Sequence, residues 1–445
     1  MSRTLKLIIA VLLFGGLNLW LGDSLGTAGA GLALMATIAW LWVTEALHVS
    51  VTALLVPLLA ALSGVLAFDE ALLQFADPVI FLFLGGFALA AGLQRQGLDR
   101  WMAGQVMRRA GAHFGRSVRW LFWLTAFLSM WISNTATAAM MLPLALGLLA
   151  PLAIEDYRRT WMYVLLGVAF SANIGGIGTL VGSPPNAIAA SNVGLSFADW
   201  LLWGLPLVLV LMPLMELALR WALKPALELK VTPPPPQAGW TRTQQQMLAV
   251  FGLTVVLWVL GAPIAEWAGL GRGYDAAVAV FALVTLHGLK LASWQDIERS
   301  TEWGVLLLFG GGLTLSKALA DSGAANWLAS QLGGPLAGMP VLLCVALMVL
   351  FALLLTEVTS NTASAALLVP LFLGLAPHVD SVPLAVLVAV GTSCAFLLPV
   401  ATPPNAIVFG SGHVPQRVMI AAGTRVTLVI YPALIAVAAL ALALY

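Results

Sequence analysis

The pattern of hydrophobic and polar positions divides this chain into long apolar stretches separated by short polar segments. A helix needs roughly 20 apolar residues to span a bilayer. Stretches close to that length occur at 5–22, 27–43, 50–67, 200–219, 246–265 and 424–445. They lack the alternation that is typical of outer-membrane β-barrel strands. The pattern therefore predicts an all-α polytopic membrane protein, and we interpret 1–26 as a retained N-terminal transmembrane helix because it lacks a clear signal-peptide cleavage site.

The composition agrees with a chain surrounded by membrane lipid. Hydrophobic residues make up 61% of the chain and charged residues only 9%, against about 25% charged residues in a typical soluble domain. The net charge of +1 gives no reason to expect a nucleic acid as partner. Cys344 and Cys394 both lie in apolar runs, which favours buried thiols over a disulfide or a metal pair.

Two halves of the chain carry the same motifs in the same order. A glycine-rich segment, a Ser-Asn-Thr triplet and a Pro-Pro-Asn-Ala-Ile motif recur at separations of 226, 227 and 219 residues. The matched positions are Gly86 with Gly312, Ser133 with Ser360, and Asn186 with Asn405. We therefore predict a duplication, with repeats at 27–222 and 247–445 and a Pro-rich cytoplasmic linker at 223–246.

Positive charge predicts that the two repeats face opposite sides of the membrane. The segment 95–119 contains six arginines, whereas its counterpart, about 318–345, contains no Lys or Arg. Short loops that are rich in Lys and Arg remain in the cytoplasm. The sequence thus predicts an inverted-topology repeat with a cytoplasmic N-terminus, which is typical of secondary transporters. We expect the membrane to be a prokaryotic plasma (inner) membrane.

The two polar triplets predict re-entrant hairpins. Each triplet separates two apolar segments that are too short, or barely long enough, to span the bilayer, at about 118–152 and about 338–376. Non-helical backbone is tolerated at membrane depth only where protein buries it or where it lines a wet cavity. We therefore expect both hairpin tips to lie at a buried site. Isolated Ser, Asn or Thr residues are more often helix caps, but the duplication argues against that reading.

The two Pro-Pro pairs predict broken helices. Two adjacent prolines cannot lie inside a continuous helix, but they are tolerated in the first turn of a new one. We expect broken helices at about 161–190 and about 383–410, unwound near 182–184 and 401–403. Such breaks expose helix N-termini, which attract anions, and backbone carbonyls, which suit sodium.

The motifs supply hydroxyls, amides and backbone groups but no cationic side chain. A bound multivalent anion would therefore need its charge compensated by other means, and sodium ions are the natural source. Nothing in the sequence indicates an organic cofactor. Glu357 lies near the second triplet, and we expect a structural role for it because Ile132 lies near the equivalent place in the first repeat.

At these residues the chain resembles the divalent anion/sodium symporter family, the sodium-coupled di- and tricarboxylate transporters. The resemblance rests on both triplets with their alanine-rich continuations and on the segments GIGTLVGSPPNAI, LTEVTSNT, LFLGGF and WLWVTEA. It implies about eleven transmembrane helices, two re-entrant hairpins, a homodimer and elevator-type transport. His48, where the family often has proline, and the missing acidic residue in LQRQGL are departures that lie away from the predicted site.

Carried over by motif position, the resemblance implies two groups of site residues. At least two sodium sites would be formed, the first near Ser129, Ser133, Asn134 and Gly182, and the second near Thr356, Thr359, Asn361 and Ala401. The substrate carboxylates would meet Asn134, Thr135, Ser183, Pro184, Asn361, Thr362, Thr402 and Pro403. The residues by themselves do not separate sodium ligands from substrate ligands.

The function that follows is sodium-coupled import of a C4-dicarboxylate such as succinate, malate or fumarate. A sodium-independent dicarboxylate exchanger and a sulfate transporter are alternatives within transport. An intramembrane enzyme with Ser133 or Ser360 as nucleophile is disfavoured, because neither triplet has a His or Lys nearby to act as the base. A passive channel is disfavoured because the polar motifs form one cluster instead of lining a path.

Overall fold

The computed structural model describes residues 2–230, 239–269 and 271–444. Within these ranges every regular element is a helix, and the one bridge of strand type pairs His113 with Lys230. Among the described residues, seven helices are long and apolar enough to cross a membrane, and further apolar helices are shorter. The predicted all-α polytopic membrane fold is confirmed.

Helices of the first half run from the N-terminus to the linker. They are α1 (Arg3–Leu25), α2 (Thr27–Thr44), α3 (Val49–Leu62), α4 (Phe68–Leu73), α5 (Pro78–Arg95), α6 (Leu98–Ala110), α7 (Phe114–Ser129), α8 (Asn134–Leu149), α9 (Ile154–Gly175), α10 (Pro184–Val193) and α11 (Phe197–Leu223).

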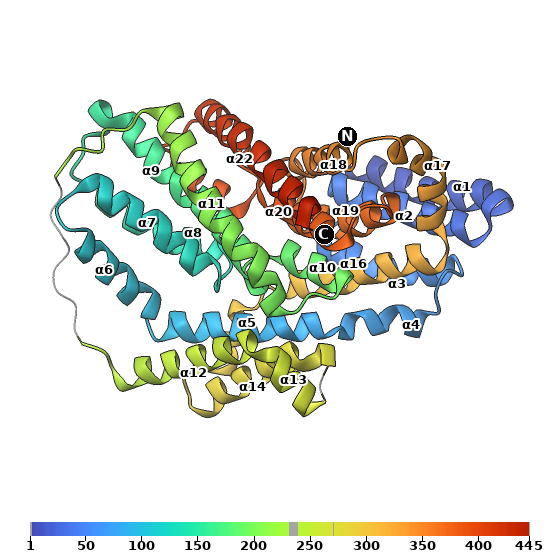
Figure 1. The fold of residues 1–445 in the computed structure, drawn as a ribbon, viewed down its shortest axis with the longest axis horizontal. Coiled ribbons are helices and arrows are strands. Elements are labelled where there is room, and N and C mark those ends of the chain that lie inside the picture. The colour runs from blue at the N-terminus through green and yellow to red at the C-terminus, as the bar shows by residue number, and fades with distance from the viewer. Residues whose placement is uncertain (1, 231–238, 270, 445) are drawn as a thin grey trace.

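Helices of the second half follow the linker. They are α12 (Arg242–Val259), α13 (Gly261–Ala268), α14 (Tyr274–Gly288), α15 (Trp294–Ser300), α16 (Trp303–Asp321), α17 (Ala324–Ala337), α18 (Val341–Thr356), α19 (Asn361–Leu375), α20 (Ser381–Ser393), α21 (Pro403–Gly410) and α22 (Gln416–Leu444). In Figure 1, α12, α13 and α14 lie along α5 on one long side of the molecule.

The order of elements repeats between the halves. The pairs are α5 with α16, α6 with α17, the hairpin α7–α8 with α18–α19, the broken helix α9–α10 with α20–α21, and α11 with α22. Gly97 and Gly323, which precede α6 and α17, both adopt positive φ, +64° and +77°. This backbone conformation favours glycine over residues with a side chain, which explains why the same glycine stands at both positions.

Each broken helix is unwound over a longer segment than the two Pro-Pro motifs predict. In the first half the α-helix ends at Gly175, and two short 3-10 turns, Gly176–Gly178 and Leu180–Gly182, lead to α10. In the second half residues 394–402 separate α20 from α21. The prolines set only the start of the second helical segment, whereas tertiary contacts, described below, hold the unwound chain that precedes it.

Part of the predicted linker, 231–238, lies outside the described residues. Its beginning returns to the first hairpin, because the amides of Phe114 and Gly115 donate to the carbonyls of Leu229 and Leu227, at 2.9 and 3.1 Å. The predicted span at 246–265 is divided, since α12 ends at Val259 and α13 begins at Gly261.

Two groups of charged residues near helix ends form ion pairs. Arg95, at the end of α5, forms an ion pair with Asp296 in α15. The Ser293 hydroxyl and amide lower the pKa of the Asp296 carboxyl, which keeps it charged as a partner. Lys317 pairs with Glu70 and Asp321 at 3.1 and 2.7 Å. Both cysteines are free and buried, as expected from their apolar surroundings.

The inverted orientation of the repeats is testable with single cysteines. In a variant with Cys344→Ala and Cys394→Ala, Ala112→Cys tests the Arg-rich segment and Ser330→Cys tests its counterpart, both at exposed positions. Because only the first segment carries the arginines that oppose translocation, an impermeant maleimide added to intact cells should label Ser330→Cys alone. Equal labelling of both variants from outside would contradict the inverted topology.

Candidate functional site

A cavity of about 550 Å3 lies where the two hairpin tips meet the two helix breaks. Most of its polar lining comes from four short segments, 133–135, 182–185, 360–362 and 401–403. Phe83 and Phe87 of α5 and Val305 of α16 supply apolar lining. Segments that are more than 200 residues apart in the chain therefore share one enclosure, as the duplicated motifs predicted.

Four helices begin at this cavity. They are α8 and α19, which follow the hairpin tips, and α10 and α21, which follow the breaks. Ser133 and Thr402 cap α8 and α21 by accepting hydrogen bonds from the amides of Ala136 and Asn405, at 3.3 and 3.2 Å. Helix N-termini carry unpaired N–H groups and positive partial charge. None of the described residues that line the cavity is Lys or Arg, so backbone ends supply the positive potential.

A cluster of three oxygens lies beside the first hairpin tip. The Ser129 hydroxyl is 2.6 Å from the Asn134 amide oxygen and 2.7 Å from the Ala172 carbonyl oxygen. One hydroxyl hydrogen cannot satisfy both acceptors. Ser129 is fully buried, so oxygen lone pairs of the cluster lie away from solvent. Oxygen lone pairs suit a small hard cation.

The second hairpin repeats this cluster. The Thr356 hydroxyl is 2.7 Å from the Asn361 amide oxygen and 2.7 Å from the Thr392 carbonyl oxygen. Thr356 is also fully buried. A hydroxyl at the end of the first hairpin helix, an amide at the start of the second and a carbonyl of the broken helix therefore recur in both halves.

Glycines allow the first break to approach the hairpin closely. A Cβ at Gly176 would lie 2.4 Å from the Asn134 amide oxygen, and a Cβ at Gly182 would lie 2.5 Å from the Gly176 carbonyl oxygen. Both distances are far shorter than a van der Waals contact. The break can therefore approach Asn134 and fold back on itself this closely only because both positions lack a side chain.

The asparagine of each Pro-Pro-Asn motif supports its own break. The Asn186 amide donates to the carbonyls of Gly176 and Thr179, at 2.8 and 2.7 Å. The Asn405 amide donates to the carbonyls of Ala395 and Leu398, both at 3.1 Å. Both asparagines are fully buried, and they add side-chain donors for carbonyls of the unwound backbone.

Asn173 connects the two breaks. Its amide lies 3.2 Å from the Thr402 hydroxyl and 3.3 Å from both the Ala395 carbonyl and the Asn405 amide oxygen. Asn173 directly follows Ala172, whose carbonyl belongs to the first oxygen cluster. One side chain therefore links the first cluster to the second break.

Glu357 binds backbone amides of the second break. Its carboxylate accepts hydrogen bonds from Phe396, Leu397 and Leu398 at 2.8 to 3.1 Å. A buried carboxylate with several N–H partners is well satisfied, and this geometry agrees with the structural role expected for Glu357. In the first half a different contact connects the hairpin to the break, because the Thr179 hydroxyl donates to the Met130 carbonyl at the hairpin tip.

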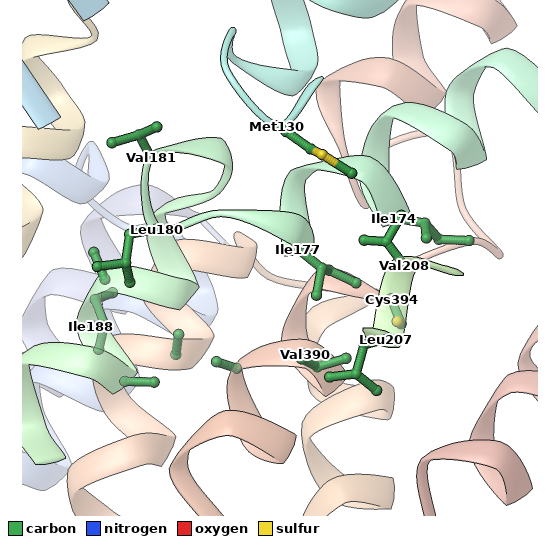
Figure 2. Packing of buried hydrophobic residues seen from close by; sticks show 14 of the residues in the cluster. Met130, Ile174, Ile177, Leu180, Val181, Ile188, Leu207, Val208, Val390 and Cys394 are labelled. Carbon is green, nitrogen blue, oxygen red and sulfur yellow. The ribbon is translucent and has the colours of Figure 1, made fainter. Parts of the chain in front are cut away.

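Buried apolar side chains pack against one side of the unwound segments. Figure 2 shows Ile177 of the first break beside Val390 of α20 and Leu207 of α11, with Ile174, Val208 and Cys394 nearby. All of these side chains are buried. The tightly packed apolar side and the polar side of each break together orient its carbonyls and helix ends.

The structure brings the eight residues predicted to contact substrate to one cavity. Asn134, Thr135, Ser183, Pro184, Asn361, Thr362, Thr402 and Pro403 all line it. Of the residues predicted near sodium, Ser133, Gly182 and Ala401 also line the cavity, and Ser129 and Thr356 lie in the oxygen clusters. Thr359 differs, because its hydroxyl bonds to the Leu355 carbonyl and the Ser364 hydroxyl of its own hairpin.

Sequence reasoning missed several residues at the site. The carbonyls of Ala172 and Thr392 carry no side-chain signal, so only the fold brings them to the clusters. The roles of Asn186 and Asn405 could have been found, since the motif that was recognised for its prolines repeats the asparagine as well. Glu45 and Glu302 also line the cavity, although they lie outside the Ser-Asn-Thr triplets and the Pro-Pro-Asn motifs.

A larger cavity of about 810 Å3 lies near α10, α13 and α14, and none of the predicted site residues lines it.

Asn186→Ala and Asn405→Ala should each lower the thermal stability of the purified protein. Each substitution removes the side-chain hydrogen bonds to two carbonyls of a break, and a typical intramolecular hydrogen bond contributes about 0.5–1.5 kcal/mol. Asn18→Ala is the matched control, because the Asn18 amide donates to the Phe14 carbonyl in its own helix. Equal melting temperatures for Asn186→Ala, Asn405→Ala and Asn18→Ala would contradict a supporting role for the motif asparagines.

Comparison with known proteins places this geometry in a family. The family model described as citrate transporter matches residues 39–391. A sodium-dependent dicarboxylate transporter, SdcS, of Staphylococcus saprophyticus is 34% identical over 96% of this chain and 89% of its own. An uncharacterized transporter of Haemophilus influenzae is 48% identical over 90% of this chain and 89% of its own.

A solved structure resembles the fold. The YdaH transporter of Alcanivorax borkumensis matches with a TM-score of 0.57 over 82% of this chain and 85% of that one, at 14% identity. At this identity the likeness shows the fold alone. The matched family model and the relatives show that the chain belongs to the citrate transporter family, together with the sodium-dependent dicarboxylate transporters that its motifs resemble, and that it is an integral membrane transporter and not an enzyme.

Proposed function

We propose that this protein imports C4-dicarboxylates such as succinate, malate or fumarate, coupled to sodium. One observation supports this proposal above all: four helix N-termini converge on one cavity. None of the described residues that line this cavity is Lys or Arg. Helix N-termini suit carboxylates, and hydroxyls and amides at the same tips can donate to them. The name of the SdcS relatives, sodium-dependent dicarboxylate transporter, supports the same substrate and ion.

Sodium has a physical reason to bind with this substrate. A buried dianion without partners would cost many kcal/mol, and helix ends offset only part of that. The two oxygen clusters lie directly beside the cavity, because Asn134 and Asn361 belong to a cluster and to the cavity lining. A sodium ion in each cluster would compensate the charge of the substrate, so substrate and ions bind best together.

We further propose elevator-type alternating access. The hairpins and broken helices pack on one another and are tied together by Asn173, which supports their motion as one body. The helices α3 and α16, and α5 and α14, form extensive contacts of their own and suit a static frame. A homodimer in a prokaryotic inner membrane, with a cytoplasmic N-terminus, completes the proposal.

Asn134→Ala and Asn361→Ala should each reduce the affinity for succinate. A hydrogen bond to a charged group contributes about 1.5–3 kcal/mol, so we expect KM for succinate to rise roughly tenfold or more in each variant. Uptake of radiolabelled succinate into proteoliposomes measures this effect. Wild-type kinetics in either variant would mean that the triplets only cap helices.

Ser129→Ala and Thr356→Ala should raise the sodium concentration needed for half-maximal uptake, since each removes one oxygen from a cluster. Thr125→Ala is a matched control one turn earlier in α7, where the hydroxyl donates to the Leu121 carbonyl.

We expect the uptake rate of the wild type to depend sigmoidally on the sodium concentration. Full uptake in sodium-free choline buffer, by the wild type and all variants alike, would favour the exchanger. Saturation by sulfate in place of succinate would favour the sulfate transporter.

A further inference from the structure

One wall of the cavity carries negative charge. Glu45, at the end of α2, and Glu302, which precedes α16, both line it. Their helix junctions are neighbours, because the Ser50 hydroxyl donates to the Gly304 carbonyl at 3.2 Å and α3 packs along α16. Glu302 and Ser133 of the first hairpin tip line the same cavity, so Glu302 faces the space proposed to hold substrate.

The two carboxylates differ in their surroundings. The Arg3 side chain donates to the Ala46 carbonyl at 3.2 Å and Lys6 to the Thr44 carbonyl at 2.6 Å, which brings two cations to the backbone on either side of Glu45. Glu302 has no ion pair among those found within residues 2–230, 239–269 and 271–444. A negative charge on Glu302 would therefore act on the cavity with less compensation than a negative charge on Glu45.

Size cannot explain discrimination between dicarboxylates and tricarboxylates here. Cavities of about 300–1,000 Å3 hold drug-sized ligands, and the 550 Å3 of this cavity would admit an acid with either four or six carbons. Both substrate classes occur in the names of the family and of its relatives. Charge is the remaining criterion, and like charges in a site of low dielectric repel strongly.

We propose that Glu302 makes the site selective for dicarboxylates by repelling a third carboxylate, with Glu45 as a weaker contributor. The inference rests on the proposed function. Four helix N-termini and two oxygen clusters suit a substrate with two negative charges. A third carboxylate would extend toward the wall formed by Glu45 and Glu302, where no described cationic side chain lines the cavity.

The test compares succinate with tricarballylate and citrate in proteoliposomes, at a pH where all carboxyls of the three acids are ionised. In Glu302→Gln the inhibition constants of citrate and tricarballylate for succinate uptake should fall about tenfold, while KM for succinate changes much less. Glu302→Asp, which keeps the charge, should retain the selectivity of the wild type. Glu45→Gln should give a smaller change than Glu302→Gln.

Glu298→Gln is the matched control, since Glu298 is exposed in the neighbouring α15 and does not line the cavity. An unchanged ratio of citrate to succinate affinity in Glu302→Gln, as in Glu298→Gln, would overturn the inference. So would a wild type that binds citrate more tightly than succinate. A wild type without sodium-driven succinate uptake would instead refute the proposed function.

A measurement on the wild type alone keeps the inference testable if Glu302→Gln does not fold. Tricarballylate with one carboxylate replaced by a carboxamide has almost the same size but one negative charge fewer. It should inhibit succinate uptake about tenfold more strongly than tricarballylate itself. Equal inhibition by the two compounds would mean that size and not charge limits the site.

Discussion

The satisfaction of backbone polar groups at the two helix breaks is the constraint on which the rest of this structure depends. Inside a bilayer no water is available to pair an exposed N–H or C=O group. Asn186 and Asn405 pair carbonyls of their own breaks, and Glu357 pairs three amides of the second. With these groups satisfied, the helix N-termini and the cluster carbonyls remain available to a ligand.

The positive potential of the site comes from backbone, because no Lys or Arg is among the described residues that line the cavity. Helix N-termini provide positive potential that cannot be lost by titration, but each supplies only partial charge. Under the proposed function, binding of a dianion would depend on cations that arrive with it, which is the physical basis of the proposed coupling. A Lys or Arg in the cavity would remove that dependence, because the substrate would then be compensated whether or not sodium was bound.

The two halves are alike in their oxygen clusters and different in what surrounds them. The hydroxyls of Ser129 and Thr356 each lie within hydrogen-bond distance of an asparagine amide oxygen and a backbone carbonyl oxygen. The first break relies on Gly176 and Gly182 for close approach, whereas the second relies on the Glu357 carboxylate. The oxygen clusters are therefore the same in both halves, whereas the contacts that hold each break in place differ.

The sequence by itself determined the all-α membrane fold and predicted the duplication, the hairpins and the breaks, because apolar length, repeated motifs and Pro-Pro pairs act locally. It also identified eight residues that the structure brings to one cavity. Only the tertiary structure decided how far each break unwinds and which carbonyls, those of Ala172 and Thr392, join the clusters. It alone brought Glu45 and Glu302 to the cavity wall, since a backbone oxygen, or a carboxylate such as Glu45 in the WLWVTEA segment, gains a role at the site only from the helices packed against it.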